Sequence, residues 1–337
     1  MLFSIVVGTY NQQDLVRRAI DSALSQSYAE PFEVIAVDDC STDGTHQTLL
    51  SYGGRVRAIR NEINRGVVWG RNAASATAQG EYIVYLDGDD ALLPWALETY
   101  ARIIELEQPV LLIAALQWFD CTVPPQVRES YASGTRYVTY EALANKDRTQ
   151  GGGASAIVAS REGFVRSGGW RADLWPLEVD DFCLRLADSK TVQILSPPTS
   201  GYVMHCSNTL ANVRLFAEKM FAIMKCERAG DYPGGKDLAQ GLKAFVGGRT
   251  FYWIRLSLKH RHFGVAARLI GSGWMLIAVA IWRRLLVRVH GLKPETVLSL
   301  GAATCGGRAR AAIRGRYRSW IGRAWQVAHS SAAKNHV

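Results

Sequence analysis

The sequence predicts an α/β fold in which a mostly parallel sheet carries helices on its faces, followed by a helical C-terminal region. Over residues 1–118, short apolar runs that suit strands alternate with segments whose apolar residues recur at helical spacing. Polar and acidic residues follow several of these runs directly, as they do where parallel strands end at a ligand-binding crevice. Beyond residue 205 the pattern becomes mainly helical.

The individual elements follow from the same patterns. The apolar residues of 15–24 fall on one helical face, and Ser41, Thr42 and Asp43 offer capping oxygens to a helix through about residue 50. The segment 119–153 is less regular, and its Pro and Gly pairs indicate loops. Regular segments resume at 154–165 and 178–187. The expected strands are 3–7, 33–37, 56–59, 82–86 and 110–116, and the other expected helices are 67–78 and one that starts at Pro94.

Composition narrows the class of protein. With 48% hydrophobic and 20% charged residues, the 337-residue chain can form a sizeable globular core. None of the six cysteines belongs to a CxxC pair, which argues against a zinc site or a disulfide framework and suits a reducing compartment. The N-terminus has no basic segment ahead of its apolar run, so we expect a first strand there and not a signal peptide.

The densest chemical signal is Asp87-Gly88-Asp89-Asp90, which directly follows the apolar run 82–86. Three carboxylates this close repel one another unless protons or a cation neutralise them. Oxygen ligands of this kind suit Mg²⁺ or Mn²⁺, which bind through one or two carboxylates together with substrate phosphates. The alternative is a polar turn whose Asp side chains cap the next helix.

Several blocks of sequence, taken together, resemble a known family. The first is Ser4-Ile5-Val6-Val7-Gly8-Thr9-Tyr10-Asn11, and the second is Glu33-Val34-Ile35-Ala36-Val37-Asp38-Asp39-Cys40-Ser41-Thr42-Asp43-Gly44-Thr45. Asn61, Asn64, Gly66, Arg71-Asn72, Gly80-Glu81-Tyr82 and the Asp87–Asp90 motif follow in order. Over residues 3 to 210 the chain resembles the family-2 glycosyltransferases, which have the GT-A fold. It departs from the family at Gly8, where proline is usual.

The resemblance implies a nucleotide-sugar donor of the UDP type and assigns residues to it. Thr9, Tyr10 and Asn11 would line the nucleotide pocket. Asp39 would accept a hydrogen bond from the imide of a uracil-type base, which only an acceptor can do. Asp87 would contact the ribose or the water shell of the metal. For Asp43 we expect helix capping.

The resemblance also implies a divalent cation, Mg²⁺ or Mn²⁺, with Asp89 as its direct ligand. His205 falls where related enzymes have a histidine that approaches the metal or the diphosphate. A lone histidine at a strand end is equally compatible with a structural role, so both interpretations of His205 stay open.

A general base normally lies in a Glu-Asp-x-Asp segment of this family, and the corresponding segment here is Glu178-Val179-Asp180-Asp181. Aligned on residues 181–186, the position of the base holds Val179, which cannot accept a proton. Asp180 is favoured through a one-residue shift, Glu178 is the alternative, and Asp181 completes the candidate set. At least one of these acids is explained as a solvated helix start near the N-terminal dipole; impaired activity is the remaining possibility.

The positive charge of the chain is concentrated at its end. From Arg283 onward there are eleven Lys/Arg and one acid, whereas the preceding residues carry a net charge of −1. The apolar stretch 269–282 is about 14 residues long, short of the roughly 20 that a membrane span needs. Arginines between 308 and 323 alternate with Ile, Tyr and Trp, a pattern typical of a helix on an anionic membrane surface. Nucleic-acid binding and a disordered basic tail are the alternatives; we expect no nucleic-acid partner.

The resemblance, together with the basic C-terminal segment, implies an inverting, metal-dependent glycosyltransferase that is peripheral on the cytoplasmic face of the membrane and serves cell-surface polysaccharide synthesis. Its acceptor would be a glycan or a lipid-linked sugar. The expected organisation is a GT-A domain over 1–230, with a nucleotide-sugar half (1–118) and an acceptor half (119–230), and a helical, basic region over 231–337. A degenerate, non-catalytic glycan- or nucleotide-binding member is the alternative that Val179 favours. A sugar nucleotidyltransferase is a weaker alternative, because Gly8-Thr9-Tyr10-Asn11 lacks the Gly-rich basic loop that it would need.

Overall fold

The strands of the protein form two sheets. A computed structural model of the chain describes residues 1–120, 134–143, 153–205, 209, 212–289 and 298–300. The strands are β1 (Phe3–Thr9), β2 (Glu33–Asp38), β3 (Arg57–Arg60), β4 (Tyr82–Asp87), β5 (Ala91–Leu92), β6 (Leu111–Ile113), β7 (Leu116–Asp120), β8 (Thr135–Tyr140), β9 (Ile157–Ser160), β10 (Thr191–Ser196), β11 (Ser200–Met204) and β12 (Leu298–Leu300).

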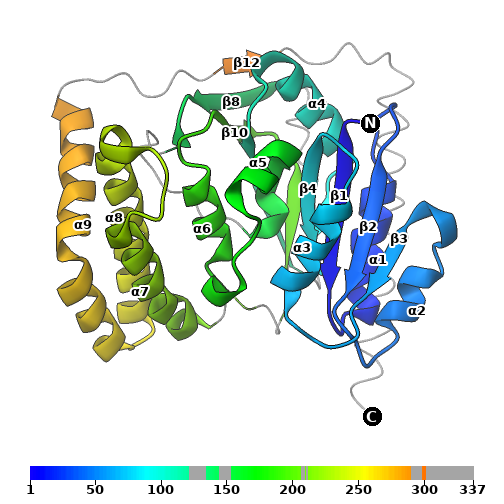
Figure 1. Ribbon diagram of the computed structural model, residues 1–337, viewed down its shortest axis with the longest axis horizontal. Helices are drawn as coiled ribbons and strands as arrows, with labels where there is room; N and C mark the ends of the chain where they lie inside the picture. Colours follow the sequence, from blue (N-terminus) through cyan, green and yellow to red (C-terminus); the bar gives the residue numbers. More distant parts are fainter. Residues whose placement is uncertain (121–133, 144–152, 206–208, 210–211, 290–297, 301–337) are drawn as a thin grey trace.

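The helices cover both faces of the larger sheet (Figure 1). Three short 3₁₀ turns lie at Gly53–Arg55, Ala154–Ala156 and Ala172–Leu174. The α-helices are α1 (Gln13–Leu24), α2 (Thr45–Leu50), α3 (Val67–Thr77), α4 (Ala96–Glu107), α5 (Arg161–Ser167), α6 (Glu178–Arg185), α7 (Val213–Ala229), α8 (Gly235–Lys259) and α9 (Phe263–Val289).

The larger sheet has the order β12-β8-β10-β6-β9-β4-β1-β2-β3. Its N-terminal half is parallel, as predicted, because β1 pairs with both β2 and β4 and β2 pairs with β3 in the same direction. Beyond β4 the sheet is mixed: β9 runs antiparallel to β4 and β6, and β8 runs antiparallel to β10. The α/β class with a C-terminal helical region is thus confirmed, and parallel pairing dominates only in the half where strands and helices alternate.

The register of the parallel half brings the predicted site loops together. Thr9 at the end of β1 lies beside Asp38 at the end of β2, and Gly8 lies beside Asp87 at the end of β4. Because parallel strands end at the same edge of a sheet, the residues that follow these three strands share one crevice. The expected convergence of polar and acidic residues at this edge is therefore present.

The side chains of β1 alternate between two apolar cores, because successive residues of a strand point to opposite faces. Phe3, Ile5 and Val7 are fully buried in a core that includes residues of α1 and α4. Val6 belongs to the other core, which extends through α3 and α6 to α7, α8 and α9. The C-terminal helices thus share one core with the face of the sheet that carries α3 and α6.

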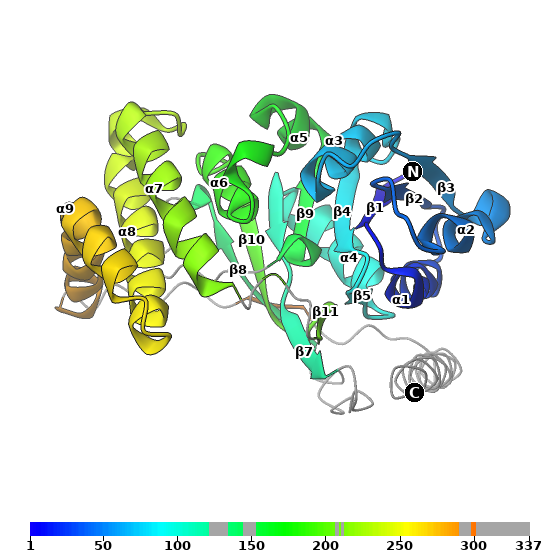
Figure 2. The same ribbon diagram turned by 90° about the horizontal axis from the view of Figure 1, so that it is seen from below.

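Helices α7, α8 and α9 stand together at the end of the molecule opposite β3 (Figure 2). A Cβ atom on Gly247 of α8 would lie 2.0 Å from the carbonyl oxygen of Leu276 in α9, so only glycine permits this close helix contact. The outer face of α9 leaves Trp274 and Trp282 exposed by 60% and 62%.

Helix α9 changes the expectation for the apolar stretch 269–282. The helix is continuous from Phe263, and its 23-residue part Phe263–Leu285 contains an 18-residue window with a mean hydropathy of 1.7. It is the one helix among the described residues that is long and apolar enough to cross a membrane, judged by length and composition. The uncharged stretch 269–282 is thus the middle of a longer helix that includes Arg268, Arg283 and Arg284.

A small sheet of order β5-β11-β7 lies beside the carboxylate motif. One of its faces packs Phe119 against Ala91 and Leu93, and a Cβ atom on Gly201 would collide with the Phe119 ring at 2.3 Å. In Figure 2, β7 and β11 project from the edge of the molecule between the N-terminal strands and the C-terminal helices. This sheet forms one wall of the crevice, because β5 directly follows the motif.

Candidate active site

The site is organised around Arg71, a buried arginine of α3. Its guanidinium donates hydrogen bonds to Asp87 Oδ1 at 2.9 Å and to Glu178 Oε1 at 3.3 Å, and lies 4.8 Å from the centre of the Trp170 ring. Burial raises the pKa of Asp87 above its usual value, and the positive charge of Arg71 opposes that rise. Arg71 thus joins the strand-end motif to the first residue of α6 and neutralises part of their charge.

Asp89 and His205 meet across the crevice. His205, immediately after β11, has its Nε2 atom 2.9 Å from Asp89 Oδ2, and both side chains are largely buried. Gly88 allows the turn to lie against the first loop, since a Cβ atom there would be 2.5 Å from Gln12 Oε1 and 2.8 Å from Thr9. The predicted pair of metal-ligating residues is thus brought together.

The donor set fits a cation of the kind expected at a diphosphate. Among the residues that the structure describes, no three His, Cys, Asp or Glu side chains form a complete metal cage. Mg²⁺ and Mn²⁺ do not need one where a substrate diphosphate supplies further oxygens, because one or two protein ligands suffice. A carboxylate and an imidazole in contact meet that requirement, so Asp89 and His205 could hold such an ion together with a bound diphosphate.

Asp90 has a structural role within the motif. It accepts hydrogen bonds from Ser155 Oγ at 2.6 Å and from the backbone N–H of Val203 at 3.0 Å, and is 1% exposed. Burial, together with the nearby charges of Asp89 and Asp87, raises the pKa of Asp90 well above its usual value. Asp90 therefore fastens β11, and with it His205, to the end of β4.

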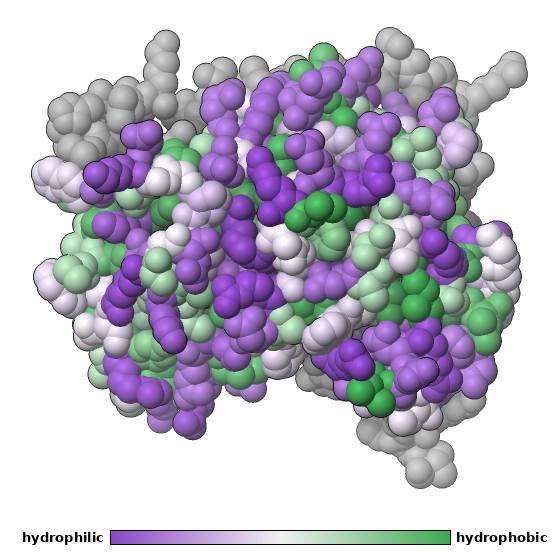
Figure 3. All heavy atoms as spheres, in the orientation of Figure 1, coloured by the Kyte–Doolittle hydropathy of each residue, from purple (hydrophilic) through white to green (hydrophobic). Residues whose placement is uncertain are grey.

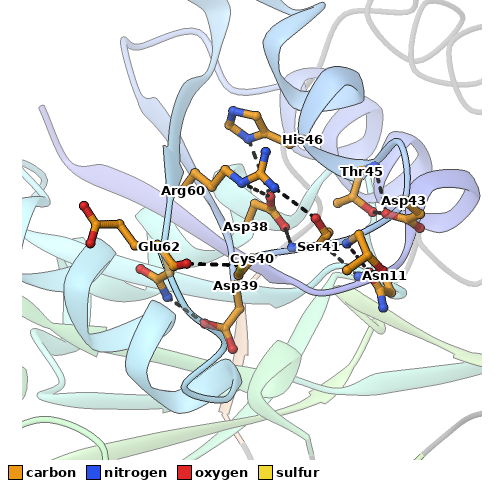
Figure 4. Close-up of polar contacts among 12 residues, drawn as sticks. Asn11, Asp38, Asp39, Cys40, Ser41, Asp43, Thr45, His46, Arg60 and Glu62 are labelled. Atoms are coloured by element: carbon orange, nitrogen blue, oxygen red, sulfur yellow. Dashed lines mark hydrogen bonds and ion pairs between the residues drawn. The ribbon is translucent and has the colours of Figure 1, made fainter.

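Asp39 is enclosed by donors from the loop that leads into α3. Its carboxylate accepts hydrogen bonds from Asn61 Nδ2 at 2.7 Å and from the backbone N–H groups of Arg65 (3.1 Å) and Gly66 (2.6 Å). In Figure 4 its side chain points away from the group formed by Asp38, Ser41 and Arg60. Both Asp39 oxygens are thus engaged, and a base imide would have to share one of them.

The three residues after β1 are placed differently from one another. Thr9 is buried and donates a hydrogen bond to Gln12 Oε1, whereas Tyr10 is 42% exposed beside it. Asn11 has a positive φ of 50°, and its backbone N–H donates to Ser41 Oγ while its side-chain oxygen accepts from the Thr42 N–H. Asparagine tolerates this conformation, which locks the loops after β1 and β2 together.

Asp43 caps the N-terminus of α2, as expected, through the N–H of its first residue, Thr45. Its carboxylate accepts hydrogen bonds from the backbone N–H groups of Gln13 and Thr45 (Figure 4). The pKa of Asp43 is lowered although burial acts to raise it, because these hydrogen bonds stabilise the charged form. Asp43 is thus fully explained by local structure.

The three acids of α6 face three different partners. Glu178 contacts Arg71, and its second oxygen, Oε2, is buried without a hydrogen-bond partner. Burial raises the pKa of Glu178, opposed by Arg71. Asp180 receives two hydrogen bonds from Arg249 of α8, at 2.7 and 3.1 Å. Val179 is half-buried against the core.

Asp181 points into the interior of the C-terminal helices. It pairs with Arg185 one turn later and accepts a hydrogen bond from the hydroxyl of Tyr232 at 3.3 Å. Burial raises the pKa of Asp181 above its usual value. These contacts anchor α6 and give Asp181 a structural environment.

The structure thus joins Asp87 to Glu178 through Arg71 and places the contact of Asp89 with His205 beside them, with Asp180 and Asp181 turned to other partners. Sequence reasoning assigned no role to Arg71, although its position was matched in the blocks that carry the family resemblance. Arg249 lies outside those blocks, and no local pattern could have linked it to α6. Hydrophilic residues predominate on the face shown in Figure 3, which includes α3, α5 and α6.

Comparison with known proteins agrees with this geometry. Residues 4–160 match the family model described as glycosyl transferase family 2. An uncharacterized glycosyltransferase of Haemophilus influenzae is 33% identical over 196 residues, which are 55% of this chain and 62% of that protein. UDP-Glc:alpha-D-GlcNAc-diphosphoundecaprenol beta-1,3-glucosyltransferase WfaP of Escherichia coli is 34% identical over 108 residues, 32% of this chain and 43% of that protein. The chain therefore spans less than two thirds of the length of these relatives.

The architecture also matches a solved structure. The crystal structure of S. aureus TarS in complex with UDP-GlcNAc superposes with a TM-score of 0.65 at 20% identity, covering 97% of this chain and 92% of that one. A parallel strand-end crevice with an acidic motif, in a sheet of this order, defines the GT-A class of nucleotide-sugar-binding folds. Over residues 4–160 the chain is similar to glycosyl transferase family 2.

Proposed function

We propose that the chain is an inverting, metal-dependent glycosyltransferase that moves a sugar from a UDP-type nucleotide-sugar to a glycan or lipid-linked acceptor in cell-surface polysaccharide synthesis. The observation that carries the proposal is the network in which Arg71 ties Asp87 to Glu178 beside the contact of Asp89 with His205. The names of similar proteins support these substrate classes. The name of WfaP contains UDP-Glc as donor and a diphosphoundecaprenol-linked sugar as acceptor, and the structure of TarS was solved with UDP-GlcNAc.

The donor would lie across the ends of β2, β1 and β4. Asp39 and the loop of Thr9, Tyr10 and Asn11 would hold the nucleoside, and Asp87 would face the ribose. Asp89 and His205 would bind a divalent cation, Mg²⁺ or Mn²⁺, whose charge stabilises the departing diphosphate. Arg71 opposes the burial that raises the pKa of Asp87 and holds its carboxyl group by a hydrogen bond.

Glu178 is the proposed general base. Inverting transfer needs one group that takes the proton of the acceptor hydroxyl while that oxygen attacks the sugar. Glu178 Oε2 has no partner, and burial raises the affinity of this carboxyl group for a proton. Asp180 is the competing candidate, but its charge is already bound by Arg249. A carboxylate with a free oxygen is the better proton acceptor.

Helix α9 is proposed to hold the enzyme on the cytoplasmic face of the membrane. Its outer face exposes large apolar side chains over its whole described length, and Arg268, Arg283 and Arg284 lie along it. Exposed apolar side chains, interfacial Trp and nearby Arg on one helix favour contact with an anionic lipid surface. The arginines beyond residue 300 lie outside the described residues and would add to this attraction.

Membrane binding is tested with vesicles that contain phosphatidylserine. We expect the full chain to sediment with them and the double substitution of Trp274 and Trp282 by Glu to remain in the supernatant at any salt concentration. Removal of residues 301–337 should weaken binding in a salt-dependent manner, because exposed charges are screened. Equal sedimentation of all three proteins would reject attachment by α9 and by the tail.

The function itself is tested by a donor-hydrolysis and transfer screen over UDP-sugars with Mn²⁺, Mg²⁺ or EDTA. Cation-dependent release of UDP, abolished in Asp89→Ala, is the expected result. The product of transfer should have the inverted anomeric configuration. Cation-dependent UDP binding without turnover on any donor would instead favour the degenerate, non-catalytic member, which the valine at position 179 motivates.

A further inference from the structure

An aromatic pair, exposed Trp118 and half-buried Tyr202, lies on the small sheet beside the site. Trp118 of β7 and Tyr202 of β11 are directly opposite each other in the strand register, with ring centres 4.5 Å apart and planes inclined by 51°. Trp118 is 52% exposed, and Met204, two residues after Tyr202 on the same face, is 42% exposed. Large apolar side chains that gather on a surface mark an interaction site.

The pair is mounted on a fixed support. The opposite face of the sheet is filled by Phe119, which packs on Gly201 and Ala91. The N–H of Val203, between Tyr202 and Met204, donates to Asp90. The small sheet therefore has its own apolar core on one face, and its other face carries the rings of Trp118 and Tyr202.

The strand register places this pair beside the carboxylate motif. β11 runs antiparallel to β5 with Gly201 opposite Ala91, so one further step places Tyr202 beside Asp90. Burial and the charges of Asp90, Asp89 and Asp87 all raise the pKa of Tyr202, which places its hydroxyl within electrostatic reach of the motif. His205 lies three positions after Tyr202, a strand length of about 10 Å.

Following the crevice from β2 gives an ordered path. The nucleoside residues lie at the ends of β2 and β1, Asp87 at the end of β4, and Asp89 with His205 beyond it. Tyr202 and Trp118 come next, on the side away from the nucleoside residues. What lies beyond the diphosphate in such a path is the sugar that leaves and the acceptor that receives it.

We propose that Trp118 and Tyr202 form a platform that binds the apolar face of a pyranose ring in the acceptor glycan. This inference rests on the proposed function and assigns its acceptor side. The C–H groups on one face of a pyranose are attracted to the negative face of an aromatic ring, while its hydroxyls stay in water at the rim. Two inclined rings beside a polar site suit such an amphipathic ligand better than an acyl chain, which would need a wholly apolar groove.

The platform predicts a preference among sugars. Pyranoses with equatorial hydroxyls present a flat face of axial hydrogens, so glucose- or N-acetylglucosamine-type residues should bind better than galactose-type residues, whose axial hydroxyl interrupts one face. The preference concerns the acceptor residue and leaves the donor free.

The experiment uses saturation-transfer NMR and titration of the full chain, loaded with UDP and Mn²⁺, with the methyl β-glycosides of glucose, N-acetylglucosamine and galactose as probes. Wild type should transfer saturation to the axial ring protons of the first two. Trp118→Ala should weaken their binding at least tenfold, whereas Trp118→Phe and Tyr202→Phe, which keep a ring, should retain most of it. Trp69→Ala, a tryptophan of α3 with a matching exposure of 50%, is the control and should bind as wild type does.

Two results would overturn the platform: no glycoside bound by the wild type, or the same affinity in Trp118→Ala as in the wild type. Unfolding of the variant is excluded by comparing its UDP affinity with that of the wild type by calorimetry. The same calorimetry separates the two proposals. Absence of UDP binding in the wild type contradicts the glycosyltransferase, whereas glycoside binding that depends on Trp118 supports the platform whatever the turnover.

Discussion

The carboxylates of the nucleotide half and those of α6 are held in opposite ways. Asp39 and Asp43 accept hydrogen bonds mainly from backbone N–H groups of adjoining loops, from partners that are 2 to 30 positions away in the chain. Glu178 and Asp180 depend instead on guanidinium groups that are 107 and 69 positions away in the chain. The first arrangement forms wherever the loops form, whereas the second exists only when the whole chain is folded. The acids of the nucleotide half are thus held by contacts within that half, whereas those of α6 depend on contacts with distant parts of the chain.

The largest effect on the transfer rate should come from substituting Glu178, whose Oε2 atom has no hydrogen-bond partner. Glu178→Gln is expected to lower the transfer rate by about 10²- to 10⁴-fold, because a general base contributes that much. UDP affinity should change little, since the nucleotide half keeps its own contacts. Steady-state kinetics with calorimetry of UDP binding measures both, and Asp180→Asn is the matched variant. A greater loss of turnover in Asp180→Asn than in Glu178→Gln would transfer the role of base to Asp180.

The ion pair between helices gives the next effect, on stability. Arg249→Met leaves Asp180 buried without its partner and is expected to lower the free energy of unfolding by about 3–5 kcal/mol. Replacing both residues, Arg249→Met with Asp180→Leu, should recover most of that loss, because no charge is then left unpaired. Urea unfolding followed by circular dichroism provides the values. If the double variant were as unstable as the single one, the cost would come from packing and not from charge.

A substitution in the nucleotide half should have a smaller and more local effect. Asp39→Asn removes the charge that three N–H donors share, and hydrogen bonds to charged groups contribute about 1.5–3 kcal/mol. Hydrogen exchange is expected to accelerate at the amides of Arg65 and Gly66 while the amides of α6 stay unchanged, and UDP affinity should fall. Acceleration in α6 as well would show that the two regions are coupled and that the contrast drawn above is wrong.

The smallest effect concerns pH. Because the pKa of Asp90 is raised, the folded protein keeps a proton that the unfolded chain releases from about pH 4 upward. The free energy of unfolding of the cation-free wild type should therefore fall as pH rises toward the folded-state pKa. Asp90→Asn cannot release this proton, so its decline should be shallower. Urea unfolding in EDTA between about pH 5 and pH 8 tests this, and identical slopes for the two proteins would contradict it.

The same contrast explains what could be predicted from the sequence. The strands and helices of residues 1–107 lie within a few positions of their predicted bounds, and Asp43 caps as expected, because apolar spacing and capping act over a few residues. The meeting of Asp89 with His205 was anticipated only through the family resemblance. The antiparallel pairing of β8 with β10, and of β9 with β4 and β6, was not predicted. The periodicity of a strand does not indicate which distant strand it will pair with.

The partners of α6 were beyond any local pattern. Aligning the acidic segment identified Val179 and three neighbouring acids. These acids lie in the first turn of α6 and point in different directions, so the sequence does not reveal which of them faces the candidate site. That depends on Arg71, Arg249 and Tyr232, which arrive from three separate elements. The predicted division at residue 230 stays a prediction, and one apolar core includes residues from both sides of it.

The contact of Arg249 with Asp180 also bears on how such enzymes diversify. Here Arg249 of α8 pairs with Asp180 of α6. Exchanging α8 and α9 alone would therefore leave Asp180 buried without its partner. Recombination within this lineage is therefore expected to preserve both residues or to lose both, and chimeras that respect the pair should express where others fail.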